Sequence, residues 1–125
     1  MKNQTNPVSY FEIPVTDIDR AKVFYTKLLD VDFEDIEVHG NKMALFPFDK
    51  NKKNISGALA QGEIYKPSIT GSLIYFAVED IDKTLTIAKS LKADILFPKT
   101  AAENWGYVAE IKDSEGNRIA LYQSF

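Results

Sequence analysis

The sequence contains no cysteine, which excludes disulfide bonds, thiolate catalysis and cysteine-bound zinc. Histidine is almost as scarce, because His39 is the only one in 125 residues. His39 follows a strand-like segment and precedes a glycine, away from the other candidate functional residues. A serine–histidine catalytic pair is therefore not supported.

No charge of one sign dominates the chain. The net charge is −3 with acids and bases interspersed, so a nucleic-acid partner is not expected. The one basic run, residues 50–53, lies between strand-like segments and is typical of a solvated loop. No apolar run is long enough to cross a bilayer, and residues 1–7 are polar rather than signal-like. We therefore expect no membrane partner and a cytoplasmic location.

What is present is typical of a globular protein. Hydrophobic residues make up 45% of the chain and charged residues 26%. A chain of 125 residues is long enough to enclose a core, so we expect one domain over residues 1–125.

The most informative feature is an internal repeat. Residues 15–20 read VTDIDR and residues 78–83 read VEDIDK, so four of these six positions are identical. Each copy follows an apolar strand-like segment and begins an amphipathic helical pattern. Asp17 and Asp80 are placed to cap the two helices, because an aspartate side chain accepts a hydrogen bond from the first turn.

Three strand-like segments follow each helical pattern, so each half of the chain reads β-α-β-β-β. The six segments cover residues 31–38, 42–48, 55–61, 94–99, 105–112 and 118–124. The sequence therefore predicts an α+β fold in which two tandem β-α-β-β-β modules form curved mixed sheets around a cleft. The first module covers about residues 8–62, a linker about residues 63–70, and the second module about residues 71–125.

Side chains alternate along a strand, so the helix-facing residues determine which residues face the cleft. In the first strand Phe11 and Ile13 belong to the core, which directs Glu12 to the cleft; in the fifth, Phe76 faces the helix and Tyr75 the cleft. The turns after the third and seventh strands match at Asp49 and Asp113, which pairs Met43 and Leu45 with Tyr107 and Ala109 as cleft residues. The expected ligand-binding residues are Tyr10, Glu12, Met43, Leu45, Ala58, Leu73, Tyr75, Trp105, Tyr107, Ala109, Ala120 and Tyr122. Their tyrosines either stack on a small ligand or fill a collapsed cleft.

Several segments, taken in order and at this spacing, resemble the vicinal oxygen chelate superfamily. That family includes glyoxalase I, bleomycin-resistance proteins and extradiol dioxygenases. The resemblance covers nearly the whole chain, and its carriers are residues 11–17, Arg20 and Ala21 with Phe24 and Tyr25, residues 78–80, and residues 113–121. It implies the two-module fold, a small-molecule ligand and a homodimer, which is common for family members of this size.

The resemblance also indicates a member without a catalytic metal. Metal-dependent members use His or Glu at cleft-facing strand positions that both halves share. The corresponding positions here are Tyr10, Leu73, Ala120 and Ala58, with Ser56 as the register alternative to Ala58. None is a histidine or a carboxylate, whereas a catalytic divalent ion needs about three protein ligands. We therefore expect no metal and no cofactor.

His39 shares a strand face with Asp35 and Glu37. That arrangement allows a loose surface metal site. The plainer interpretation is a set of solvated charges that protect an edge strand from pairing with another chain.

Three functions remain open. The first is metal-free binding of a small aromatic or amphipathic molecule, as in the bleomycin-resistance branch, with Glu12 contacting a cationic or hydrogen-bond-donating group. The second is a metal-free lyase or isomerase in which Glu12, the only catalytic candidate, is a general base made stronger by burial among aromatic rings. Glu12 paired with a lysine or with Arg118 is the structural alternative. The third, a metal-dependent lactoylglutathione lyase or dioxygenase, is disfavoured by the missing ligands.

Overall fold

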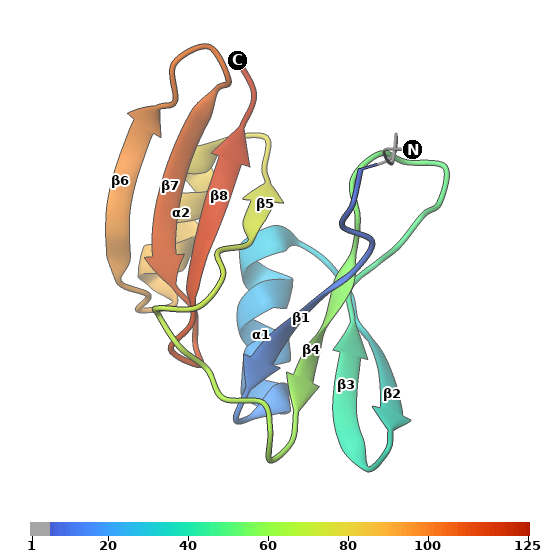
Figure 1. Ribbon diagram of the computed structural model, residues 1–125. Coiled ribbons are helices and arrows are strands. Elements are labelled where there is room, and N and C mark those ends of the chain that lie inside the picture. Colours follow the sequence, from blue (N-terminus) through green and yellow to red (C-terminus); the bar gives the residue numbers. More distant parts are fainter. Residues whose placement is uncertain (1–5) are drawn as a thin grey trace.

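A computed structural model describes residues 6–125, and within them the chain forms two helices and eight strands (Figure 1). Part of the polar N-terminal stretch, residues 1–5, lies outside the described residues. Neither described helix is long and apolar enough to cross a membrane.

Each half of the chain forms one β-α-β-β-β module. The elements of the first module are β1 (Phe11–Val15), α1 (Ile18–Leu29), β2 (Glu34–Val38), β3 (Asn41–Leu45) and β4 (Gly57–Gln61). Those of the second module are β5 (Tyr75–Ala77), α2 (Ile81–Ser90), β6 (Ile95–Ala101), β7 (Tyr107–Lys112) and β8 (Arg118–Gln123). The strand orders are β1-β4-β3-β2 and β5-β8-β7-β6, each with one parallel pair, so the predicted α+β fold of two tandem modules is confirmed.

Both helices begin where the repeat predicts. The Asp17 carboxylate accepts a hydrogen bond of 3.1 Å from the Arg20 N–H, and the Asp80 carboxylate accepts one of 3.2 Å from the Lys83 N–H. Each cap satisfies a backbone donor that has no partner within the helix. The two predicted N-caps are therefore confirmed.

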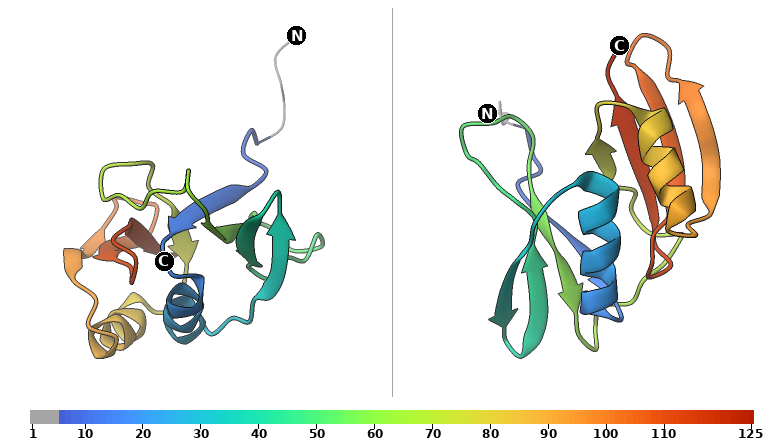
Figure 2. Two further views of the ribbon diagram at one scale, coloured as in Figure 1. Left: turned by 90° about the horizontal axis from the view of Figure 1, so that it is seen from below. Right: turned by 180° about the vertical axis from the view of Figure 1, so that it is seen from behind.

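The two helices lie on the same side of the two sheets, as the left view of Figure 2 shows. The opposite side of each sheet, which we call its free face, has no helix over it. The helix-facing side carries the main core, where Ile13, Leu59 and Ala44 lie in register across β1, β4 and β3 and are buried. Their methyl and branched side chains leave α1 room to pack closely on the sheet.

Aromatic side chains join the two modules. The Phe76 ring of β5 lies 5.9 Å from the Phe11 ring, 5.6 Å from the Phe46 ring and 5.8 Å from the Tyr25 ring of α1. These centroid distances lie in the range preferred by interacting aromatic pairs. The helix-facing assignment of Phe76 and the outward assignment of Tyr75, which is 53% exposed, are therefore confirmed.

The predicted faces of Tyr107 and Ala109 are wrong. Ala109 pairs with Leu121 and is buried with Ile81 of α2, and the Tyr107 side chain packs against the same cluster. Tyr107 and Ala109 therefore lie on the helix-facing side. The prediction aligned the two hairpins through their turns, but residues 46–56 connect β3 to β4, whereas residues 113–117 suffice between β7 and β8. A shift of one residue in a strand moves every side chain to the opposite face.

The structure places Val108 and Glu110 on the free face instead. Val108 pairs with Tyr122 and Glu110 pairs with Ala120, and directly paired residues share a face. Trp105 also lies outside the strand, because β7 begins at Tyr107, and its side chain is 70% exposed.

Candidate functional site

The free face of the first module carries a carboxylate held by two phenols. The Tyr10 hydroxyl donates to Glu12 Oε2 and the Tyr65 hydroxyl donates to Glu12 Oε1, each over 3.0 Å. Glu12 is exposed and forms no ion pair among the described residues. The carboxylate is therefore fixed in place but keeps its negative charge uncompensated.

An apolar patch lies directly beside this carboxylate. Glu12, Ala58 and Leu45 are neighbours in register across β1, β4 and β3, so they share the free face. Met43 and Ala58 are buried there, partly because the Tyr65 side chain packs against them. The apolar area that a ligand can reach beside the carboxylate therefore comes from the rings of Tyr10 and Tyr65 and from Leu45, because Met43 and Ala58 are covered.

The two phenols remain neutral hydrogen-bond donors at ordinary pH. Burial and the hydrogen bond to Glu12 raise the pKa of Tyr10 to about 12. The hydrogen bond to Glu12 also raises the pKa of Tyr65, because ionisation would place two negative charges side by side. Both hydroxyls therefore stay protonated and donate their hydrogen bonds to the carboxylate.

The general-base alternative requires a Glu12 carboxylate buried among aromatic rings, and the structure shows an exposed one. The alternative pairing with Arg118 is wrong, because Arg118 Nε lies 2.5 Å from Glu110 Oε1. Glu110 and Arg118 form their ion pair on the free face of the second module, beside Ala120.

The remaining predicted residues gather in the second module. Tyr75 pairs with Ala120 on the free face, and the Tyr122 hydroxyl donates to the Trp105 carbonyl. Leu73, Tyr75 and Tyr122 line a groove of about 1360 Å³ between the modules. Five of the predicted residues therefore belong to the Glu12 patch and three line this groove. The other four, Trp105, Tyr107, Ala109 and Ala120, belong to neither.

The residues at the family's metal-ligand positions do not fit a catalytic metal. Ala58 and Ala120 are buried and carry only methyl groups, and Leu73 has no donor atom. Tyr10 donates its hydroxyl to Glu12. Within residues 6–125 no three His, Cys, Asp or Glu side chains lie close enough to hold a metal ion. At the surface position considered for His39, Asp35 pairs with Lys22 Nζ at 2.8 Å.

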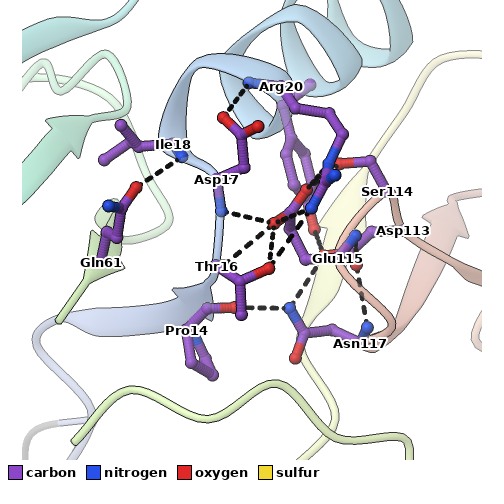
Figure 3. Close-up of polar contacts among 11 residues, drawn as sticks. Pro14, Thr16, Asp17, Ile18, Arg20, Gln61, Asp113, Ser114, Glu115 and Asn117 are labelled. Carbon is purple, nitrogen blue, oxygen red and sulfur yellow. Dashed lines mark hydrogen bonds and ion pairs between the residues drawn. The ribbon is translucent and has the colours of Figure 1, made fainter. Parts of the chain in front are cut away.

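The junction between β1 and α1 is closed by the turn between β7 and β8 (Figure 3). The Glu115 side chain, which is fully buried, accepts hydrogen bonds from the backbone N–H groups of Thr16 at 3.0 Å and Asp17 at 2.9 Å. Its second oxygen lies 2.7 Å from Arg20 Nε. Asn117 adds a hydrogen bond from its side-chain amide to the Pro14 carbonyl, so this turn fixes the second module to the first.

The surroundings of Glu115 strongly favour its charged form. Burial alone would raise the pKa of this carboxyl, but hydrogen bonds from Arg20, Asp17, Ser114 and Thr16 outweigh burial and lower the pKa to about 2. Glu115 therefore remains ionised at all physiological pH values.

The residues that make up this fold and this junction also identify the family. The family model for the Glyoxalase/Bleomycin resistance protein/Dioxygenase superfamily matches residues 8–121. The chain belongs to this superfamily. No curated protein matches the sequence at a significant level.

Solved structures of the superfamily superpose over almost the whole chain. TnmS3, an antibiotic-binding protein from Streptomyces sp. CB03234, is 21% identical, with a TM-score of 0.67 over 99% of this chain and 100% of its own. A glyoxalase/bleomycin resistance protein from the same organism is 27% identical, with a TM-score of 0.65 over 92% and 98%. The trypanothione-dependent glyoxalase I of Leishmania major is 18% identical, with a TM-score of 0.73 over 95% and 87%.

Sequence reasoning missed two contributors to the site. Tyr65 lies in the connection between the modules, where no strand periodicity predicts the direction of a side chain. Glu110 was assigned to the wrong face through the hairpin alignment described above. Only a longer-range signal, such as the pairing of Glu110 with Arg118, could have placed it on the free face.

Proposed function

We propose that this superfamily member is a metal-free binding protein for a small aromatic or amphipathic molecule that carries a cationic or hydrogen-bond-donating group. The observation that carries the proposal is the Glu12 carboxylate, oriented by Tyr10 and Tyr65 and left without a cationic partner among the described residues. A ligand ammonium can donate a charge-assisted hydrogen bond to the Glu12 carboxylate and stack against the phenol rings. The antibiotic-binding relative supports a small-molecule role.

Three matched probes test the charge preference. Phenethylamine, 2-phenylethanol and phenylacetate share an aromatic ring and differ in charge. Each can be titrated into isotopically labelled protein and followed by the amide signals of residues 10–12 and 58–65. Judged by the signals of Tyr10, Glu12 and residues 58–65, which do not line the groove between the modules, the amine should bind the Glu12 site most tightly and the carboxylate least tightly. Glu12 attracts the one and repels the other.

The matching variant is Glu12→Gln, with Glu63→Gln as its control. Glu63 lies in the linker, is exposed, and its side chain makes no hydrogen bond within residues 6–125. Loss of its negative charge should therefore leave binding unchanged. Glu12→Gln should weaken binding of the amine by at least about tenfold, because it removes the charge from a hydrogen bond worth about 1.5–3 kcal/mol. Equal affinities of the amine for wild type and Glu12→Gln would refute the proposal.

The absence of a catalytic metal is part of this proposal. Its support is the set of side chains at the family's ligand positions, where alanine, leucine and tyrosine stand. Protein purified without chelator should contain no stoichiometric zinc, nickel, iron or manganese by elemental analysis. One metal per chain that disappears on mutation of free-face residues would contradict the metal-free assignment.

The proposal also includes a cytoplasmic homodimer in which residues 1–125 act as one domain. Support for a dimer comes from apolar surface on edge strand β2, where Ile36 is 37% and Val38 is 40% exposed. Sedimentation at micromolar concentration should show a species of twice the chain mass. A single species of 14.1 kDa would refute the dimer and leave the ligand proposal to its own test.

A further inference from the structure

The repeat produces two β–α junctions, and a protein carboxylate occupies only one of them. At the start of α1, the Glu115 carboxylate accepts hydrogen bonds from the N–H groups of Thr16 and Asp17 and forms an ion pair with Arg20. The equivalent residues at the start of α2 are Glu79, Asp80 and Lys83. Among the described residues, no hydrogen-bond acceptor meets the N–H of Glu79 or Asp80, and Lys83 forms no ion pair.

The second junction opens into the groove between the modules. Glu79, Asp80 and Lys83 line one part of this groove of about 1360 Å³. Apolar side chains from both modules line much of the rest, among them Val8, Phe11, Leu28, Phe46, Phe76 and Ile87. Polar residues also line it, including Asn6, Asp30, Asn54 and Ser56. Lys27, at the end of α1, also lines the groove and has no ion-pair partner among the described residues.

We propose that this groove binds an amphipathic carboxylate, that is, a carboxylic acid with a hydrocarbon or aromatic body. The carboxylate takes the position at α2 that Glu115 takes at α1, between the two backbone N–H groups and the Lys83 ammonium. The body of the ligand covers the apolar wall formed by Phe11, Phe46 and Phe76. The occupied junction of the same chain is the template for this recognition, since it shows these backbone donors and a cation holding a carboxylate.

Three acidic side chains line the groove, namely Asp30, Glu79 and Asp80, and their negative charges weaken the binding of a carboxylate. The Asp80 carboxylate is engaged by the Lys83 N–H, as Asp17 is by Arg20 at the occupied junction. Glu79 stands where Thr16 offers a hydroxyl to Glu115, so it removes one donor and adds one like charge. Replacing Glu79 with threonine therefore makes the open junction more like the occupied one.

Decanoate, decanol and decylammonium, used below their micellar concentrations, test the proposal by isothermal titration. They share one tail, so differences between them report the head group. Decanoate should bind at least about tenfold more tightly than decanol, because charged hydrogen bonds replace neutral ones. These titrations use the Glu12→Gln variant, because decylammonium can also bind the Glu12 site of the wild-type protein. Equal binding of decanoate and decanol to this variant, or tighter binding of decylammonium, would overturn the proposal.

Three variants place the head group. Lys83→Ala should abolish most of the preference for decanoate over decanol, and Glu79→Thr should increase it severalfold. Lys89→Ala is the control, because Lys89 lies on the same helix but does not line the groove. Identical decanoate affinities for Lys83→Ala and Lys89→Ala would refute the assigned position.

Two further measurements distinguish this proposal from binding at the Glu12 site and from a groove covered by a second copy of the chain. Glu12→Gln should leave decanoate binding unchanged, since Glu12 does not line the groove. Decanoate binding that appears only when the protein is diluted to monomers would show that a second copy of the chain covers the groove, and would overturn the proposal.

Discussion

The starts of α1 and α2 have nearly the same sequence and the same capping aspartate, yet one is closed and the other is open. The difference comes from the hairpins. Residues 113–117 form a short turn that places Glu115 at the first junction. Residues 46–56 form a longer connection that contains lysines and makes no hydrogen bond to the second junction among the described residues. An internal repeat thus supplies one junction that holds the modules together and one that remains available to a ligand.

The largest expected effect comes from removing the aromatic contact that both halves share. Phe76→Ala should lower the free energy of unfolding by about 3 kcal/mol, because the ring contacts Phe11, Phe46 and Tyr25. Tyr75→Ala, one residue earlier on the opposite face, should change it by no more than about 0.5 kcal/mol. Urea unfolding measures both. Comparable losses for the two variants would contradict the face assignment of β5.

Glu115→Ala should have the next largest effect, about 2–3 kcal/mol, because it leaves Arg20 and two backbone N–H groups without their acceptor. Asn51→Ala is the matched change in the connection between β3 and β4, because the Asn51 side chain makes no hydrogen bond in the described part of the chain. That control should stay within about 0.5 kcal/mol of wild type. Similar denaturation midpoints for the two variants would show that the closed junction contributes no more than the open one.

Acid should weaken the closed junction selectively. The pKa of Glu115 falls from its ordinary 4.5 to about 2 in the folded protein, so its stabilisation is complete above pH 4.5 and is lost as the pH falls toward 2. Urea unfolding of wild type and Glu115→Gln at pH 7, 4.5, 3.5 and 2.5 should therefore show a difference that shrinks over the three lower values. A difference that stays constant down to pH 2.5 would contradict the lowered pKa.

The smallest effect distinguishes the two basic residues that the repeat aligns. Arg20→Ala should lower the midpoint of thermal unfolding only modestly, because its side chain is 53% exposed and solvent screens the ion pair. Lys83→Ala should change stability by less than about 0.5 kcal/mol, since Lys83 forms no ion pair in the described residues. Thermal unfolding checks both, and a larger loss for Lys83→Ala would mean that the open junction is also bound by the protein itself.

The sequence predicts the elements of this fold because local rules determine them. The aspartate caps, the apolar stripes of the helices and the alternation in β1 and β5 are each visible within a few residues. The partners of Glu115, Glu12 and Arg118 are not, because tertiary contacts between distant segments decide them. A hairpin alignment that is wrong by one residue was enough to misplace Tyr107 and Ala109, although the strand itself was correctly predicted.

The contact between Thr16 and Glu115 joins residues 99 positions apart in the chain. During synthesis the first module leaves the ribosome long before the turn that caps its helix exists. Until residues 113–117 emerge, the start of α1 presents the same open donors that the start of α2 keeps in the finished protein. The nascent first module should therefore be less stable than the same residues after synthesis of residues 113–117, and the emergence of that turn should stabilise the start of α1.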